Sequence, residues 1–147
     1  MHIKEIINNK EKFIDILLIG DENIDMINKY LNIGKLFALY EDDLKSVCVI
    51  VELDDNSFEL KNLATYPKYQ NNGYASKLID FLCANYKTKY KELILGTGEN
   101  DKTLHFYKKR GFVEFKKIKN FFTKNYPHPI FENGIQLKDM IFLKKIL

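Results

Sequence analysis

The order of apolar and polar segments predicts an α/β fold of the α+β kind. We expect a mixed, mostly antiparallel sheet of six to seven strands with about four helices. Three strand-like segments, near residues 34–40, 46–52 and 57–65, are separated only by short acidic turns. Such tight polar turns predict an antiparallel meander. A strand–helix–strand unit then follows over residues 57–97, and this crossover makes the sheet mixed.

The remaining elements follow from local patterns. An alternating segment predicts a first strand near residues 2–7, and helices are expected near 10–19 and 22–31, with Asp21 as an N-cap of the second. A longer amphipathic helix begins near Gly73. Its apolar face consists of Leu78, Ile79, Leu82 and Cys83. Further on, the pattern predicts a strand at 91–97, a helix at about 101–109, and strands near 112–118 and 137–145.

Length and composition indicate one globular domain over residues 1–147. Apolar residues make up 46% of the chain and charged residues 29%, and no linker or repeat divides it. No apolar run approaches the roughly 20 residues that span a bilayer. The N-terminus lacks the apolar block of a signal peptide, so we expect a cytoplasmic protein without a membrane partner.

The cysteines and histidines do not form a metal-binding pattern. Cys48 and Cys83 each lie within an apolar stretch, which predicts small buried side chains and no disulfide. The three histidines are scattered, so we expect no metal. The net charge is +3, but 20 acidic residues are interspersed with the lysines, which argues against a nucleic-acid partner.

The segment before the long helix has the character of a phosphate site. A glycine that opens a helix after a strand leaves backbone N–H groups free at the positive end of the helix dipole. Neither a P-loop nor a dinucleotide-binding glycine pattern is present. A glycine needed only for turn geometry is the alternative. The candidate ligands of a pyrophosphate are Gln70, Asn71, Asn72, Gly73, Tyr74, Ala75 and Ser76.

A second motif follows the strand at 91–97. Asn100 comes at the end of that strand, Tyr107 lies seven residues later on the predicted helix, and Gly111-Phe112 leads into the next strand. Together with Gln-x-x-Gly-x-Ala at the first helix, this arrangement resembles the GNAT superfamily of N-acetyltransferases. The resemblance covers most of the chain.

The resemblance implies a cofactor site and a fold feature. Acetyl-CoA would be the cosubstrate, and two central parallel strands would splay apart to admit its pantetheine arm. The arm would pair with the backbone at Leu63, Ala64 and Thr65. Asn100 would hydrogen-bond the arm or simply cap the following helix. Tyr107 would protonate the departing thiolate, or would only pack against the core.

One departure from the family concerns charge. Many members carry Arg or Lys in the glycine turn, where this chain has Asn71 and Asn72. The charge that assists phosphate binding is therefore missing from the turn itself. Lys77 or Lys108 could supply it.

Glu59 is the candidate general base. It lies fourteen residues before Gly73, a spacing similar to that of the base glutamate in histone-acetylating members of the family. Strict strand alternation would place it on one face with Lys61, Leu63 and Thr65. A surface glutamate paired with Lys61 is the equal alternative, and many members of the family use a water chain instead.

The irregular segment 121–134 is expected to border the acceptor. Tyr126, His128 and Glu132 are candidate substrate contacts, and Glu132 suits a cationic amine; a packed loop with surface polar residues is the alternative. The apolar strand ending in Met140–Leu143 could pair with a second copy and give a homodimer.

The predicted function is transfer of an acetyl group from acetyl-CoA to a primary amine of a small molecule or peptide, directly within a ternary complex. Two alternatives stay open. One is a non-catalytic CoA-binding or interaction protein on the same fold, and the other is an acetyltransferase that acts on aminoacyl-tRNA.

Overall fold

The computed structural model describes residues 1–147 and contains one seven-stranded sheet in the order β1-β2-β3-β4-β5-β9-β6. All neighbouring pairs are antiparallel except β4 with β5, which is the expected mixed sheet. The strands are β1 (His2–Ile6), β2 (Lys35–Glu41), β3 (Asp43–Glu52), β4 (Ser57–Thr65), β5 (Glu92–Gly98), β6 (Val113–Ile118) and β9 (Met140–Ile146).

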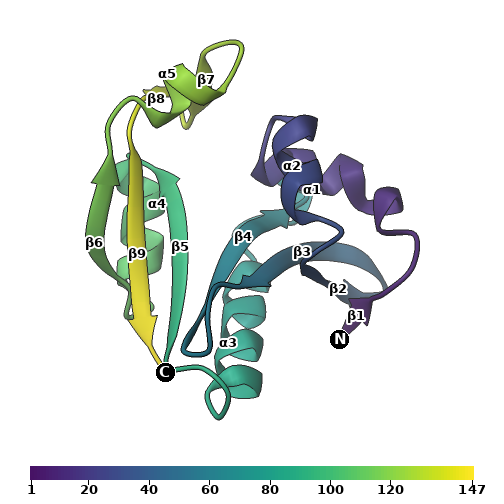
Figure 1. Cartoon of the computed structure of the whole chain (residues 1–147). Coiled ribbons are helices and arrows are strands. Elements are labelled where there is room, and N and C mark those ends of the chain that lie inside the picture. Colours follow the sequence, from purple (N-terminus) through teal and green to yellow (C-terminus); the bar gives the residue numbers. More distant parts are fainter.

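Helices cover both faces of this sheet. The pair α1 and α2 packs on one face of β2–β4, while α3 and α4 pack on the opposite side (Figure 1). The helices are α1 (Ile14–Gly20), α2 (Ile24–Tyr30), α3 (Tyr74–Tyr86), α4 (Asp101–Lys108) and α5 (Phe121–Asn125), with short 3-10 turns at Lys10–Phe13 and Pro67–Tyr69. None of these helices combines the length and the apolar character that a membrane-spanning helix needs.

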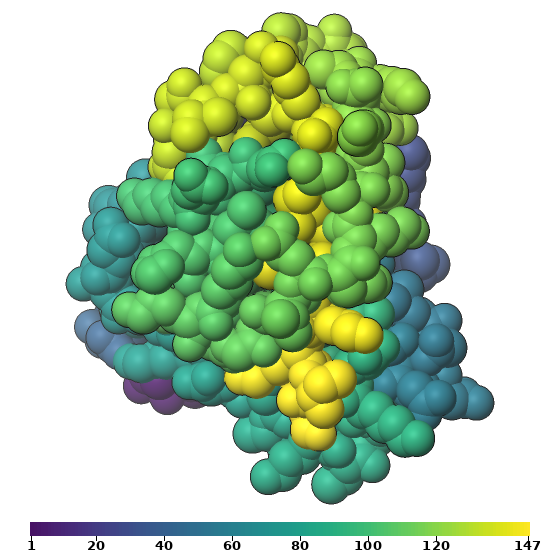
Figure 2. Space-filling model, turned by 90° about the vertical axis from the view of Figure 1, so that its left-hand side faces the viewer, coloured from purple at the N-terminus to yellow at the C-terminus, as the bar shows by residue number.

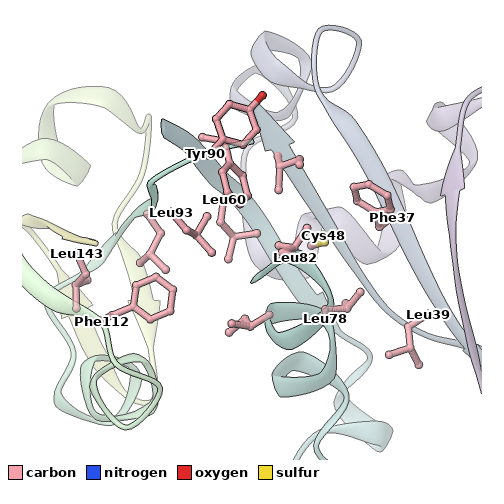
Figure 3. Close-up of a cluster of buried hydrophobic side chains, with 14 of the residues drawn as sticks. Phe37, Leu39, Cys48, Leu60, Leu78, Leu82, Tyr90, Leu93, Phe112 and Leu143 are labelled. Carbon is pink, nitrogen blue, oxygen red and sulfur yellow. The ribbon is translucent and has the colours of Figure 1, made fainter. Parts of the chain in front are cut away.

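The main core lies between the sheet and α3. Figure 3 shows Leu78 and Leu82 of α3 directed toward Cys48 and Leu60 of the sheet. The apolar face predicted for this helix is confirmed, since Leu78, Ile79 and Leu82 are fully buried. Both cysteines are free thiols, Cys48 buried in this core and Cys83 half-buried at its edge.

The N-cap predicted at Asp21 is wrong. Asn23 caps α2 instead, and its side-chain oxygen accepts the N–H of Met26 at 3.1 Å. Both residues are good N-cap types two positions apart, so the pattern alone could not choose between them. The Asp21 carboxylate is therefore available for other contacts.

The segment between β6 and β9, predicted to be irregular, forms a small subdomain. After α5 it contains a hairpin of β7 (Ile130–Glu132) and β8 (Ile135–Leu137), and Phe122, Ile130 and Leu137 make its own small core. Strands of three residues are too short to show a period of two. In the space-filling view this subdomain forms the upper end of the molecule, above α4 and β6 (Figure 2).

Candidate functional site

The two parallel strands β4 and β5 pair only over part of their length. Their register runs from Ser57–Glu92 to Leu60–Leu95 and then stops. Beyond this point β4 remains paired with β3 and β5 with β9, so the two edges that face one another diverge (Figure 1). Their unpaired N–H and C=O groups can bind an extended ligand as a strand would be bound.

A groove of about 650 Å³ occupies this divergence; we call it the β4–β5 groove. It runs between β4 residues 60–65, β5 residues 95–97, the start of α3 and one side of α4. The three strand residues expected beside a pantetheine arm, Leu63, Ala64 and Thr65, all line it.

A β-bulge at Lys61 lies where the strands separate. Val49 of β3 pairs with Asn62, but the next β3 residue pairs with Leu60, which leaves Lys61 as the extra residue. A bulge bends a strand and shifts the faces to which the following side chains point. Leu60 and Leu63 consequently face the same core although they are three positions apart.

The face that Glu59 was predicted to share with Leu63 and Thr65 is wrong for the same reason, whereas the alternative, a glutamate paired with Lys61, is present. Because Phe58 and Leu60 point to the α3 core, Glu59 points to the α1–α2 side, away from Leu63. Its side chain is 13% exposed and lines neither of the two cavities described in this section. Its carboxylate accepts a hydrogen bond from Lys61 Nζ at 3.3 Å. Lys61, unlike Glu59, lines both cavities.

Free backbone amides converge at one end of the groove. The N–H groups of Gly73, Tyr74, Ala75 and Ser76, at the start of α3, donate to no atom of the protein. The side chain of Asn72 donates to the carbonyls of Tyr69 and Gln70, at 3.0 and 3.1 Å, and steadies the turn. Of the seven predicted phosphate ligands only Asn72 does not line the groove. This end suits an anion.

Gly73 has a backbone that favours glycine but surroundings that would admit a side chain. Its φ of 84° lies in the left-handed region, and a Cβ built there would have no heavy atom within 4 Å. Gly73 therefore has the left-handed backbone that would explain a glycine needed only for the turn. The open space around Gly73 also means that a ligand can approach its amide closely.

Arg110 provides the positive charge that the glycine turn lacks. It is the only arginine of the chain, and it reaches from the end of α4 to the first turn of α3. Its Nε donates to Ser76 Oγ at 2.9 Å, its Nη1 donates to the Phe106 carbonyl at 2.7 Å, and its guanidinium lies 3.8 Å from the centre of the Phe106 ring. Arg110 lines the groove with N–H donors to spare.

The two lysines considered for this role are engaged elsewhere. Lys108 pairs with Glu114 at 2.6 Å, and Lys77 lies over the ring of Tyr74 at 5.7 Å. Neither lines the groove. The sequence analysis did not identify Arg110 as a groove residue, because it lies 34 positions from Ser76. Its position within the second motif was a usable signal.

Tyr107 lines the groove from α4 and is half-buried. Its ring packs edge-on against Phe106 and Phe112, with centroids 5.1 and 5.6 Å apart. Burial, and secondarily the charge of Glu132, raise the pKa of its phenol above the ordinary value. Tyr107 therefore stays protonated through the neutral and moderately alkaline range, as a proton donor must.

Asn100 is placed as a structural residue. Its side-chain oxygen caps α4 by accepting the Lys102 N–H at 3.1 Å, and its amide nitrogen donates to the Glu132 carbonyl at 2.8 Å. It is 2% exposed and lines neither cavity. The helix-cap interpretation describes these contacts, and a contact with the cofactor arm stays a prediction.

A second, smaller cavity of about 180 Å³ joins the groove; we call it the side pocket. It lies between residues 19–22 at the C-terminal end of α1, the end of β5 and the hairpin subdomain. Tyr126 and Glu132, two of the three predicted acceptor contacts, line it, whereas His128 is exposed and lies outside. Asp21 and Glu22 also line it and were not identified from the sequence.

Comparisons with known proteins agree with this geometry. A family model described as an acetyltransferase (GNAT) domain matches residues 32–114. The uncharacterized N-acetyltransferase YvbK of Bacillus subtilis (strain 168) is 30% identical over 136 residues, which are 90% of this chain and 88% of that protein.

Two solved structures resemble the whole chain. A GNAT family acetyltransferase of Elizabethkingia anophelis with acetyl-CoA bound superposes with a TM-score of 0.92 and 36% identity, over 99% of this chain and 97% of the other. A Bacillus subtilis acetyltransferase in complex with CoA has a TM-score of 0.88 and 29% identity, over 99% and 98% of the two chains.

Proposed function

This chain belongs to the GNAT acetyltransferase family, and we propose that it transfers the acetyl group of acetyl-CoA directly to a primary amine while both substrates are bound. The observation that carries the proposal is the β4–β5 groove. It joins free amides and Arg110 at one end to unpaired strand edges and Tyr107, and then opens into the side pocket.

Each part of acetyl-CoA has a complementary part of the groove. The amides of residues 73–76 and the Arg110 guanidinium suit the pyrophosphate. The unpaired edge of β4 at residues 63–65 suits the amide groups of the pantetheine arm. The thioester then lies toward the end of the groove that meets the side pocket, where the amine can enter.

The transfer requires two proton movements. The amine nitrogen attacks the thioester carbon, the carbon–sulfur bond breaks, and its electron pair goes to sulfur. Tyr107 donates its hydroxyl proton to that sulfur, and the nitrogen loses its proton to a carboxylate or to water. Holding both substrates in the joined cavities supplies orientation without a covalent enzyme intermediate. The buried thiol of Cys48 is not needed.

Glu132 is better placed than Glu59 to accept the amine proton. Glu132 lines both cavities, and its charge acts on Tyr107. Glu59 lines neither cavity and is held by Lys61, so it would require a chain of water molecules. We propose Glu132, with or without one water, as the first acceptor of this proton.

Release of free CoA thiol in the presence of acetyl-CoA and a panel of primary amines tests the proposal. We expect amine-dependent release, and we expect Tyr107→Phe to lower kcat about 100-fold while acetyl-CoA still binds. Binding of acetyl-CoA without release for any amine would favour the non-catalytic alternative. Unchanged release by Tyr107→Phe would remove Tyr107 from the mechanism.

A further inference from the structure

The side pocket has more negative charge than its own residues neutralise. Asp21, Glu22 and Glu132 line it, and none of them takes part in an ion pair within the protein. The only lysine that lines it is Lys61, whose ammonium is already paired with Glu59 at 3.3 Å. A partly enclosed pocket of this kind favours a cationic ligand.

The carboxylate of Asp21 is fixed in place. It accepts the hydroxyl of Tyr126 at 2.9 Å, the N–H of Asn23 at 3.2 Å and the hydroxyl of Tyr30 at 3.4 Å. Tyr126 is 105 positions away in the sequence, so this contact joins the hairpin subdomain to the α1–α2 turn. All three partners are uncharged donors, so the negative charge of Asp21 remains without a cation.

In the adjoining β4–β5 groove, one buried side-chain oxygen has no hydrogen-bond donor from the protein. Asn62, which is 3% exposed, lines the β4–β5 groove, and its Oδ1 has no hydrogen-bond partner. The amide orientation is fixed, since Nδ2 donates to the Leu17 carbonyl and to Tyr30 Oη, each at 3.0 Å. Oδ1 lies beside Gly20, which lines both cavities. A buried oxygen left without a donor destabilises the structure that contains it.

The arrangement places negative charge at two positions. Glu132 and Thr97 line both cavities and mark the end where the amine would meet the thioester. Asp21 and Glu22 line only the side pocket. The side pocket has a volume of about 180 Å³, which is the volume of roughly six water molecules at about 30 Å³ each. The ring of Tyr126 adds an aromatic surface that can contact a cation.

We propose that the side pocket selects an acceptor with a second positive charge, a short alkyl diamine or the aminoalkyl end of a larger polycation. This inference rests on the proposed function. One ammonium lies beside Asp21 and Glu22, and the other amine faces Glu132 and the groove. An acceptor with a carboxylate at its far end is rejected, because it would face Asp21.

Three probes of one length test the second charge: 1,4-diaminobutane, n-butylamine and 4-aminobutanoate. Each is titrated calorimetrically into the protein saturated with CoA, and its acetylation is then measured with acetyl-CoA. We expect the diamine to bind about 10-fold or more tightly than butylamine, and 4-aminobutanoate to bind most weakly. Equal binding of the diamine and butylamine, or preferred binding of 4-aminobutanoate, overturns the proposal.

Variants locate the effect. Asp21→Asn should reduce the affinity for the diamine to that for butylamine, while butylamine binding and the preference of the control Glu11→Gln stay unchanged. If Asp21→Asn does not fold, Glu22→Gln decides: a reduced preference for the diamine supports the pocket, and an unchanged one refutes it. Preferred diamine binding without any acetylation would contradict the proposed function, and only the selection of a doubly charged ligand by the side pocket would remain.

Discussion

Replacing Gly73 with Asn and with Asp distinguishes the proposed phosphate site from a glycine that only the turn requires. These two side chains have nearly the same shape, and both tolerate the left-handed backbone better than other non-glycine residues. At φ 84° with open space around the Cβ, each should cost about 1 kcal/mol of unfolding free energy, or a decrease in Tm of about 2–4 °C. Only the aspartate adds a charge to the amides at the start of α3.

The charge should decide binding. Two unit charges 4 Å apart interact by about 4 kcal/mol near a protein surface, and salt and solvent reduce this to about 2 kcal/mol in the open groove. Gly73→Asp should therefore bind acetyl-CoA about 30-fold more weakly than Gly73→Asn. Calorimetric titration with thermal melting of each variant provides the measurement. Equal affinities in two cooperatively melting variants would refute a pyrophosphate at this turn.

Three further predictions follow from neighbouring contacts. Arg110→Gln should weaken acetyl-CoA binding by about 10-fold or more and leave the binding of acetyl-pantetheine, which lacks the pyrophosphate, unchanged; equal weakening of both ligands would contradict the phosphate role. Because burial raises the pKa of Tyr107, loss of its proton should not reduce kcat between pH 7 and about 9.5, and a decrease there that disappears in Tyr107→Phe would contradict this assignment. Glu132→Gln should lower kcat more than Glu59→Gln, measured with saturating amine, and the opposite order would restore Glu59 as the base.

The fold was predictable because most of its elements carry a local signal. The bounds of β4 agree with the expected 57–65, and α3 begins one residue after the glycine that predicted it. The hairpin subdomain was missed because β7 and β8 are three residues long. Local periodicity cannot identify strands of that length, which are held by pairing with each other and by the small core around Phe122.

The sequence by itself determined the free amides at the start of α3, since a glycine after a strand and before a helix leaves such amides unpaired whatever the rest of the chain does. It also placed Tyr107 on the helix that borders the groove. Only the tertiary structure decided which charged side chains line the groove and the side pocket. Arg110 meets Ser76 and Asp21 meets Tyr126 across long stretches of chain, and the bulge at Lys61 turned Glu59 away from the groove. These contacts and the strand register depend on segments that are far apart in the sequence. A local pattern of residues therefore cannot predict them.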